Sequence, residues 1–341
     1  MAIEKVKEII KSSPAFTSLI DLAAEQLGGE VLYATDDFFA EKENLLKKGR
    51  GVFIADKYTD RGKWMDGWES RRKRTSGHDW AVIRLATSGK ITGVDIDTNF
   101  FLGNHPPHAS IEAAYLESDV EIADWNSIKW QEILTKSPLD AGSQNFYEIS
   151  DKQIFTHIRL HIYPDGGVAR FRVYGEVYKK WDLVLPNQEI DLAAAILGGK
   201  ALACNDMFFS DMGNLLMPNP GINMGDGWET KRNRTPGNRD WVIVKLAIPG
   251  TIKRILVDTA HFKGNYPDSC SVEACLNDND QDVLENKNEW NTILPTQKLR
   301  AHAQHEFVSE LTNEAVYSHV RLNMFPDGGI SRLRLFGIKK V

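Results

Sequence analysis

The alternation of apolar and polar residues is clearest in the segment from Phe155 to Gly175. Apolar residues occupy every second position of its first half, and the residues between them are His157, Arg159 and His161. This period of two indicates a strand with one buried face and one polar face. A turn sequence, Pro-Asp-Gly-Gly, follows at 164–167, and the alternation then resumes. The pattern predicts a β-hairpin with an apolar inner face.

Short runs rich in valine, isoleucine and aromatic residues recur along the chain, bounded by Gly, Pro, Asn and Asp. The clearest are Trp80–Leu85, Ile91–Ile96 and Ile154–Ile162, with the later counterparts Trp241–Leu246, Ile252–Val257 and Val316–Met324. Helical patterns are few. The first dozen residues have spaced apolar positions, and Leu19–Gln26 and Asp191–Leu197 each predict one short turn. Many short strands separated by turn residues predict an all-β protein built from β-sandwiches.

The chain repeats its own motifs once. Asp-Gly-Trp-Glu-Ser at 66–70 returns as Asp-Gly-Trp-Glu-Thr at 226–230, and Tyr-Pro-Asp-Gly-Gly at 163–167 returns as Phe-Pro-Asp-Gly-Gly at 325–329. Solenoid repeats have periods of only about 20–50 residues, so this spacing indicates a duplicated domain. We predict two tandem domains of one fold, at residues 1–178 (the first copy, with a short N-terminal extension) and 179–341 (the second copy).

The first copy contains a segment that the second lacks. Equivalent residues are offset by 170 at Asp21 and Asp191, but by 160 at Asp66 and Asp226. The first copy therefore has about ten extra residues within Lys47–Lys63, immediately before its Asp-Gly-Trp-Glu motif.

Composition and charge limit the classes of function. The hydrophobic content of 42%, the charged content of 26% and the net charge of -6 are ordinary for a soluble protein and argue against binding nucleic acid by phosphate neutralisation. The three cysteines, Cys204, Cys270 and Cys275, all lie in the second copy, which is no disulfide framework. The N-terminus lacks the apolar core of a signal peptide, and no apolar run approaches the ~20 residues that span a bilayer. We expect a cytoplasmic protein without nucleic-acid or membrane partners.

A charged segment follows the tryptophan motif of the first copy. Glu69 is followed by four cations in Arg71–Arg74, and then by His78 and Asp79. Cations beside a carboxylate, with a His-Asp pair close behind, could bind a small anion and position an acid or base. The alternative is a solvated loop between tryptophans with structural roles. We favour the structural role for the tryptophans themselves, Trp68, Trp80, Trp228 and Trp241.

The polar face of the predicted hairpin also has two interpretations. It could bind substrate through Arg159 and His161, and the second copy replaces His161 with Asn323. In the simpler interpretation, the arginines of this face bridge carboxylates on the neighbouring strand, such as Glu112 and Glu273.

Metal binding is the weaker hypothesis. His105 and His108 lie three residues apart, and His157 and His161 share a strand face, but none has a cysteine or carboxylate at zinc-site spacing. The sequence also has no glycine-rich phosphate loop and no nucleophile elbow. We expect no cofactor, with a divalent metal as the open alternative.

Taken together, the duplicated motifs resemble the allantoicase family. In the first copy they are Asp-Gly-Trp-Glu-Ser-Arg-Arg at 66–72, Gly-His-Asp-Trp at 77–80, Asp-Thr-x-Phe-x-x-Gly-Asn at 97–104, and Arg-Leu-x-x-Tyr-Pro-Asp-Gly-Gly-x-x-Arg-x-Arg at 159–172. The resemblance extends from about Asp21 to Gly337. It implies two tandem jelly-roll β-sandwich domains of the galactose-binding-like kind. It also implies a homo-oligomeric hydrolase of carbon–nitrogen bonds in linear amidines, which converts allantoate and water to ureidoglycolate and urea in purine breakdown.

The resemblance carries no settled catalytic residues, so the site is assigned from the chemistry. Expelling urea requires a proton on its departing nitrogen, and an arginine fork suits the substrate carboxylate. We predict Glu69, His78 and Asp79 as catalytic residues. We predict as substrate-binding residues Arg71, Arg74, Asn104, Arg159 and His161.

The first copy is expected to hold the principal site. It alone has the extra segment, and it alone has His78, His105 and His161 near the shared motifs. Histidine is the side chain best suited to proton transfer near neutral pH. The competing class is a non-enzymatic tandem jelly roll that binds a glycan or a small anionic ligand. Loops rich in arginine, rather than in exposed aromatic residues, favour the enzyme.

Overall fold

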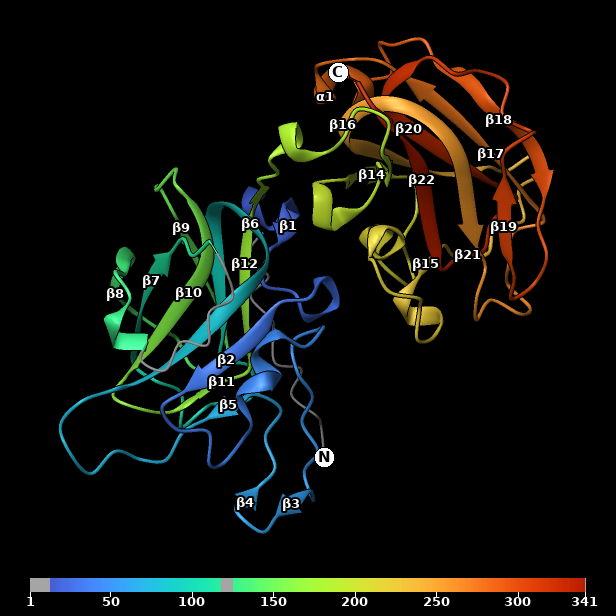
Figure 1. Cartoon of the computed structure of the whole chain (residues 1–341). Coiled ribbons are helices and arrows are strands. Elements are labelled where there is room, and N and C mark those ends of the chain that lie inside the picture. Colours follow the sequence, from blue (N-terminus) through green and yellow to red (C-terminus); the bar gives the residue numbers. More distant parts are fainter. Residues whose placement is uncertain (1–12, 118–124, 341) are drawn as a thin grey trace.

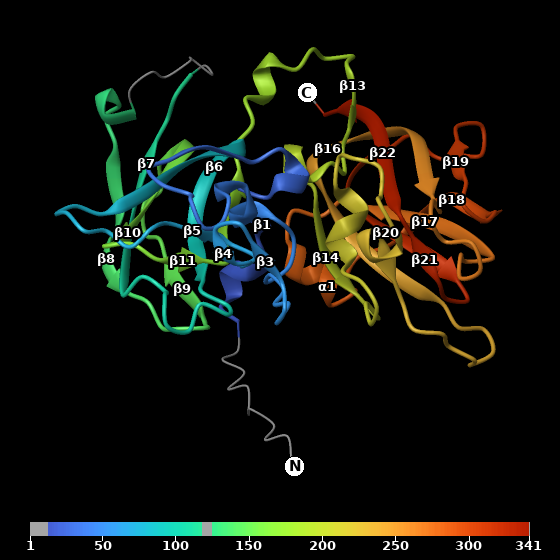
Figure 2. The same ribbon diagram turned by 90° about the horizontal axis from the view of Figure 1, so that it is seen from below.

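The computed structural model of the protein describes residues 13–117 and 125–340. Each copy forms its own β-sandwich, and the two sandwiches lie side by side (Figures 1 and 2). The strands of the first copy are β1 (Ile20–Asp21), β2 (Glu30–Ala34), β3 (Tyr58–Thr59), β4 (Gly62–Lys63), β5 (Trp68–Glu69), β6 (Asp79–Asp97), β7 (His108–Ala114), β8 (Gln131–Pro138), β9 (Gln144–Glu148), β10 (Ile154–Tyr163), β11 (Gly167–Val168) and β12 (Arg170–Val177).

The second copy repeats this order without counterparts of β3 and β4. Its strands are β13 (Glu189–Asp191), β14 (Lys200–Cys204), β15 (Trp228–Glu229), β16 (Asp240–Asp258), β17 (Ser269–Cys275), β18 (Asn291–Lys298), β19 (Gln304–Phe307), β20 (Val316–Phe325), β21 (Gly329–Ile330) and β22 (Arg332–Lys339). The helices of the described residues are short: η1 (Ala15–Ser18), η2 (Glu25–Leu27), η3 (Lys42–Leu46), η4 (Trp125–Ser127), η5 (Trp181–Leu183), η6 (Ala195–Leu197), η7 (Met212–Leu216), η8 (Met224–Asp226) and α1 (Asp280–Leu284).

One long strand belongs to both layers of each sandwich. The first half of β6 pairs with β2 and β10, and β10 continues the layer to β7 and β8. The second half of β6 pairs with β12 and β9, and β12 pairs with β1. In the second copy β16 has the same double role. The expected all-β fold of two tandem jelly-roll sandwiches is therefore confirmed.

The predicted hairpin over 155–175 is wrong. β10 pairs with β6 and β7, whereas β12 pairs with β6 and β1, so the two strands lie in different layers. The Pro-Asp-Gly-Gly turn carries the chain from one layer to the other, and β11 within this connection pairs with β5. The alternation identified the buried face of each strand correctly, because each of the two layers of a sandwich has one apolar face that lies toward the core.

Each sandwich encloses an apolar core. Trp68 and Trp228 are fully buried at equivalent places, as expected of structural tryptophans, whereas Trp80 and Trp241 are only half-buried. The core of the second copy also takes in Leu27 of the first copy, which is only 3% exposed. The two copies therefore share apolar packing as well as a fold.

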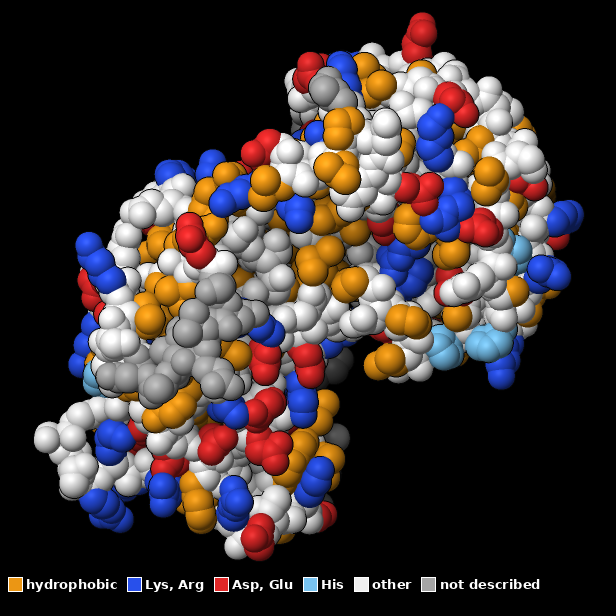
Figure 3. All heavy atoms as spheres, in the orientation of Figure 1, with side chains coloured by type: hydrophobic (Ala, Val, Ile, Leu, Met, Phe, Trp, Pro, Cys, Tyr) orange, Lys and Arg blue, Asp and Glu red, His pale blue; other side chains and the backbone are white. Residues whose placement is uncertain are grey.

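Polar contacts and a groove mark the junction between the copies. Nε2 of Gln26 donates to Oδ1 of Asp226 at 2.7 Å, and Nζ of Lys48 lies 2.9 Å from Oδ1 of Asn214. A groove of about 770 Å³ runs along this junction, where hydrophobic side chains are visible in Figure 3. In the connecting segment, Val184 is buried but Leu185 is 69% exposed. No helix in residues 13–117 or 125–340 is both long and apolar enough to cross a bilayer.

Candidate functional site

The local fold of the first copy directs the Glu69 side chain outward. Successive side chains of a strand point to opposite faces, and the preceding residue, Trp68, is fully buried. The indole Nε1 of Trp68 donates to the carbonyl of Asp36 at 2.8 Å. The backbone of Glu69 is held on one side by Ala40 and on the other by Gly167 of β11. Glu69 is therefore fixed by its neighbours on a short strand.

Among the described residues, the side chain of Asn104 is the hydrogen-bond partner of the Glu69 carboxyl group. Nδ2 of Asn104 donates to its Oε1 at 2.6 Å. Burial raises the pKa of Glu69, and the hydrogen bond from Asn104 only partly offsets this effect. The two side chains line a pocket of about 400 Å³, which we call the Glu69 pocket. Its other lining residues are Phe39, Phe53, Gly62, Lys63, Met65, Phe100, Leu102 and Gly103.

The extra segment of the first copy forms one wall of this pocket. Phe53 stacks on Phe100, with their ring centroids 5.5 Å apart, and Nζ of Lys63 lies 4.6 Å from the centroid of Phe53. In Figure 1 the segment, with β3 and β4, projects from one end of the first sandwich. Lys63 brings a positive charge to a pocket that otherwise holds Glu69, Asn104 and apolar groups.

The second copy has an equivalent pocket, in which arginine side chains supply the positive charge. Nδ2 of Asn265 donates to Oε1 of Glu229, and burial raises the pKa of Glu229 as well. The pocket measures about 640 Å³ and is lined by Arg232 and Arg234 from the segment after Glu229. The glutamate–asparagine pair is thus common to both copies, whereas the positive charge comes from different parts of the chain.

His78 and His161 belong to a separate network on the outer face of β10. Oε2 of Glu112 accepts hydrogen bonds from Nε2 of His161 at 2.8 Å and from Nε of Arg159 at 2.8 Å. Nδ1 of His161 lies 2.8 Å from Nε2 of His78. Since His161 donates to Glu112 through Nε2, its Nδ1 is the acceptor when the ring is neutral, and His78 is the donor. Within the described residues, no contact joins this network to Glu69.

The electrostatics of the network keep its histidines neutral. Burial lowers the pKa of His161 to about 4 and also lowers the pKa of His78. Burial alone would raise the pKa of Glu112, but hydrogen bonds from Arg159 and His161 outweigh it and lower that pKa. Arg159 and Glu112 form the bridge between strands that the simpler interpretation described, and Arg321 and Glu273 repeat it in the second copy at 2.8 Å.

The remaining predicted residues lie outside both groups. Asp79 is 1% exposed, and its Oδ1 accepts from Nζ of Lys73 at 2.5 Å and from Oγ1 of Thr35 at 2.8 Å. Arg71 pairs with Asp36 at 2.6 Å. Arg74 is exposed and forms no side-chain hydrogen bond or ion pair with any residue that the structure describes. In residues 13–117 and 125–340, no three His, Cys, Asp or Glu side chains come together as metal ligands.

Comparison with known proteins identifies the family. A family model described as Allantoicase repeat matches residues 20–178 and again residues 190–340. The chain belongs to the allantoicase family. It is 53% identical over 326 residues to a probable allantoicase of Photobacterium profundum, covering 95% of this chain and 98% of the relative. A probable allantoicase of Pseudomonas fluorescens is 51% identical over 329 residues, covering 96% and 98%.

The solved structures agree with the sequence comparison. The crystal structure of allantoicase from Saccharomyces cerevisiae superposes with a TM-score of 0.80 at 36% identity, covering 94% of this chain and 96% of the yeast chain. Another solved structure of allantoicase gives a TM-score of 0.81, covering 94% of this chain and 93% of that chain.

Two features of this allantoicase family member were not expected as parts of a site. Lys63 lines the Glu69 pocket, and its signal in the sequence was the extra segment that ends at this residue. Asp165 was expected only to form its turn, but its Oδ2 also accepts from the backbone N–H of Lys73 at 2.7 Å. It thereby fixes the loop between Glu69 and His78. In the second copy, Oδ2 of Asp327 likewise accepts from the backbone N–H of Asn233 at 2.9 Å.

Proposed function

We propose that this chain hydrolyses allantoate to ureidoglycolate and urea, and that the reaction takes place in the Glu69 pocket. The observation that carries the site assignment is a glutamate with a raised pKa, held by Asn104, in a small pocket that is also lined by Lys63. The relatives named above, probable allantoicases that match this chain over nearly its whole length, support the reaction.

The shape of the substrate fits the groups of the pocket. Allantoate carries one carboxylate and two ureido groups on a single carbon. Lys63 binds the carboxylate as a point charge. Asn104 donates to Oε1 of Glu69 and holds that carboxyl group in one orientation. The stacked rings of Phe53 and Phe100 form an apolar wall beside these groups.

Glu69 acts first as an acid and then as a base. Its carboxyl group gives a proton to the nitrogen of the departing ureido group as the bond from that nitrogen to the central carbon breaks, and urea leaves. The remaining ureido nitrogen shares its lone pair with the central carbon. Water then adds to this carbon, and the Glu69 carboxylate takes the released proton, which gives ureidoglycolate and restores the acid. A raised pKa favours this cycle, because the acid must be protonated near neutral pH.

The sequence-based assignments of Arg71, Arg74 and Arg159 to the substrate carboxylate stay predictions. Arg71 and Arg159 are bound to Asp36 and Glu112, and none of the three arginines lines the Glu69 pocket. For this reason we assign the carboxylate to Lys63. His78 and Asp79 likewise stay predicted catalytic residues, and His161 stays a predicted substrate-binding residue.

The reaction is tested by incubating the purified protein with allantoate and measuring urea. Release of one urea for each allantoate consumed is expected, and binding of a glycan without any turnover of allantoate would contradict the proposal. The carboxylate assignment is tested by comparing Lys63→Ala with Arg71→Ala. If Arg71→Ala raises KM more than Lys63→Ala does, the carboxylate site belongs to Arg71.

We further propose a cytoplasmic homo-oligomer. The three cysteines are all free thiols, which supports a reducing compartment. Phe208, Phe209 and Ile222 of the second copy are 69%, 61% and 77% exposed, and exposed apolar side chains of this size support contact with another subunit. Light scattering coupled to gel filtration measures the assembly, and a monomer mass at all concentrations would exclude it.

A further inference from the structure

The extra segment of the first copy begins at a contact with the second copy. Nζ of Lys48 lies 2.9 Å from Oδ1 of Asn214 and 3.3 Å from Oδ1 of Asp226. Asp226 is itself buried, and its Oδ2 pairs with Arg332 at 2.8 Å. The ammonium group of Lys48 therefore reaches an anion whose position the second copy fixes.

The second copy has no lysine equivalent to Lys48. Asn-Leu-Leu at 44–46 aligns with Asn-Leu-Leu at 214–216, which places Pro218 opposite Lys48. Proline has no side-chain donor, so the second copy cannot return the contact. The lysine contact is thus made from the copy that has the extra segment, whereas from the second copy Nδ2 of Asn219 donates to the carbonyl of Gln26 at 3.4 Å.

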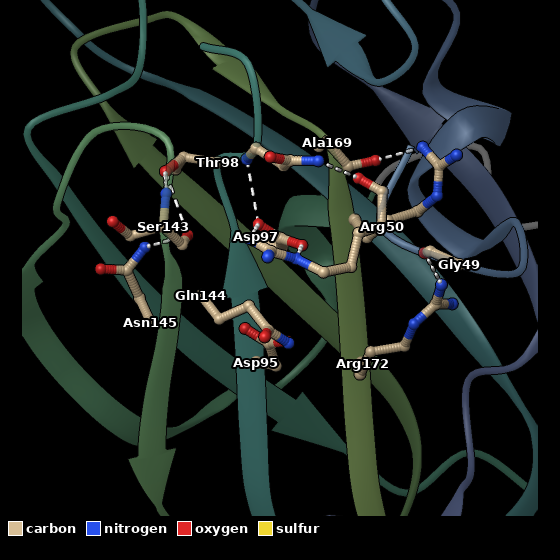
Figure 4. Close-up of polar contacts among 12 residues, drawn as sticks. Gly49, Arg50, Asp95, Asp97, Thr98, Ser143, Gln144, Asn145, Ala169 and Arg172 are labelled. Atoms are coloured by element: carbon tan, nitrogen blue, oxygen red, sulfur yellow. Dashed lines mark hydrogen bonds and ion pairs between the residues drawn. The ribbon is translucent and has the colours of Figure 1, made fainter. Parts of the chain in front are cut away.

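The backbone on both sides of Lys48 is held by side chains of the first sandwich, and Figure 4 shows the bonds at Gly49 and Arg50. The guanidinium group of Arg172 donates to the carbonyls of Leu46, Lys47 and Gly49. Arg50 forms a bidentate pair with Asp97, with Nε 2.8 Å from Oδ2 and Nη2 3.2 Å from Oδ1. Two paired bonds fix the direction of a guanidinium group as well as its position. The backbone beside Lys48 is thus held to the first sandwich, and the Lys48 side chain links this held segment to the second copy.

Contacts of the next residues connect this segment to the Glu69 pocket. The backbone N–H of Val52 donates to Oδ2 of Asp66 at 2.8 Å. Phe53 then stacks on Phe100, and Lys63 lies over the ring of Phe53. Phe53 and Lys63 both line the pocket. An unbroken series of contacts thus leads from Asp226 of the second copy to the wall of the Glu69 pocket.

We propose that Lys48 is a positioning residue through which the second copy sets the place of Phe53 and Lys63, and so the affinity of the first copy for its substrate. This inference rests on the proposed function of the Glu69 pocket. Lys48 touches neither the substrate nor Glu69, so its loss affects binding of the carboxylate more than the chemical step.

The test compares Lys48→Ala with Lys47→Ala. Lys47 is a matched control, because among the described residues its Nζ bonds to Asn44 of its own copy, at 2.6 Å, and to no residue of the second copy. We expect Lys48→Ala to raise KM for allantoate about five- to tenfold, a usual size for coupling between two sites, with kcat within about twofold of the wild type. Lys48→Arg, which keeps the charge, should restore most of the affinity. Lys47→Ala should leave KM unchanged.

A second measurement does not depend on the substrate. Hydrogen exchange followed by mass spectrometry should show faster exchange of backbone amides in residues 49–57 for Lys48→Ala than for Lys47→Ala or the wild type. If Lys48→Ala lowers the unfolding midpoint but leaves KM and this exchange at the values of Lys47→Ala, Lys48 is only a structural tie and the inference is overturned. If the wild type releases no urea, the proposed function fails, whereas the exchange experiment still decides whether Lys48 holds the segment.

Discussion

The pKa of Asp95, a buried acid on β6, gives a quantitative prediction of how the stability of the protein depends on pH. The residue is 2% exposed, and its Oδ2 accepts from Nε2 of Gln144 at 2.7 Å, whereas its Oδ1 has no hydrogen-bond partner in the part of the chain that the structure describes. Burial raises the pKa of Asp95 to about 7, against the effect of the hydrogen bond from Gln144, and the nearby Asp97 adds to the increase. The second copy has an apolar residue, Leu256, at this position.

The size and sign of the effect follow from the two pKa values. In the unfolded chain Asp95 loses its proton near its model value of 3.8, but in the folded protein it keeps the proton up to about pH 7. Between these values the folded state binds more protons than the unfolded state, so the free energy of unfolding falls as pH rises. At about 1.4 kcal/mol for each pH unit, the loss amounts to about 4 kcal/mol in total and about 3 kcal/mol between pH 5 and 7. Above pH 7 it levels off.

Asp95→Asn removes the titrating group and should remove this slope. We expect the free energy of unfolding of the variant, relative to the wild type, to rise by about 3 kcal/mol between pH 5 and 7, as measured by urea denaturation at several pH values. Any change in the free energy of unfolding that the new amide itself causes does not depend on pH, so it does not affect the comparison of slopes. Glu148→Gln, which changes an exposed acid on β9, should follow the wild type at every pH. A difference between Asp95→Asn and the wild type that stays flat over this range would refute the reasoning.

Three further predictions concern the pocket and the core. Glu69→Gln should lower kcat for urea release by at least about 100-fold, because the acid is lost, and Glu229→Gln should have a smaller effect; equal losses would indicate a site shared between the copies. Lys63→Ala should raise KM for allantoate about tenfold with little change in kcat, as steady-state kinetics would show, and an unchanged KM would remove Lys63 from the carboxylate site. Trp68→Ala and Trp228→Ala should each destabilise their own sandwich by about 3–5 kcal/mol in denaturant unfolding, since both side chains are fully buried; a loss below about 1 kcal/mol for either variant would contradict the placement of that tryptophan in a core.

The sequence was sufficient for the fold class, and its errors have a physical origin. Period-two alternation reports which face of a strand is buried, but it does not identify the neighbouring strand. The segments at β10 and β12 therefore looked like a hairpin, although they lie in separate layers. The break between Leu85 and Ile91 looked like the end of one strand and the start of another. In the structure β6 passes through this break without interruption and serves both layers.

The candidate site was predictable only in part. Glu69 and Asn104 stand in duplicated motifs, and the structure brings them together. Lys63 could not be paired with them, because the sequence does not show how the extra segment folds back onto the sandwich. Arg71 was attractive as an anion-binding residue, but its partner Asp36 lies 35 residues earlier in the chain, and no local pattern connects the two.

The packing of Leu27 makes the second copy depend on the first for its complete core. This side chain of the first copy is part of the core of the second copy. A second copy expressed alone would expose the apolar surface that Leu27 covers, and it would leave Asp226 without the hydrogen bond from Gln26. The two copies of a duplicated domain are often regarded as independent folding units. Here the covalent link keeps the two packed surfaces at a high effective concentration, so that Leu27 of the first copy completes the core of the second without a separate association step.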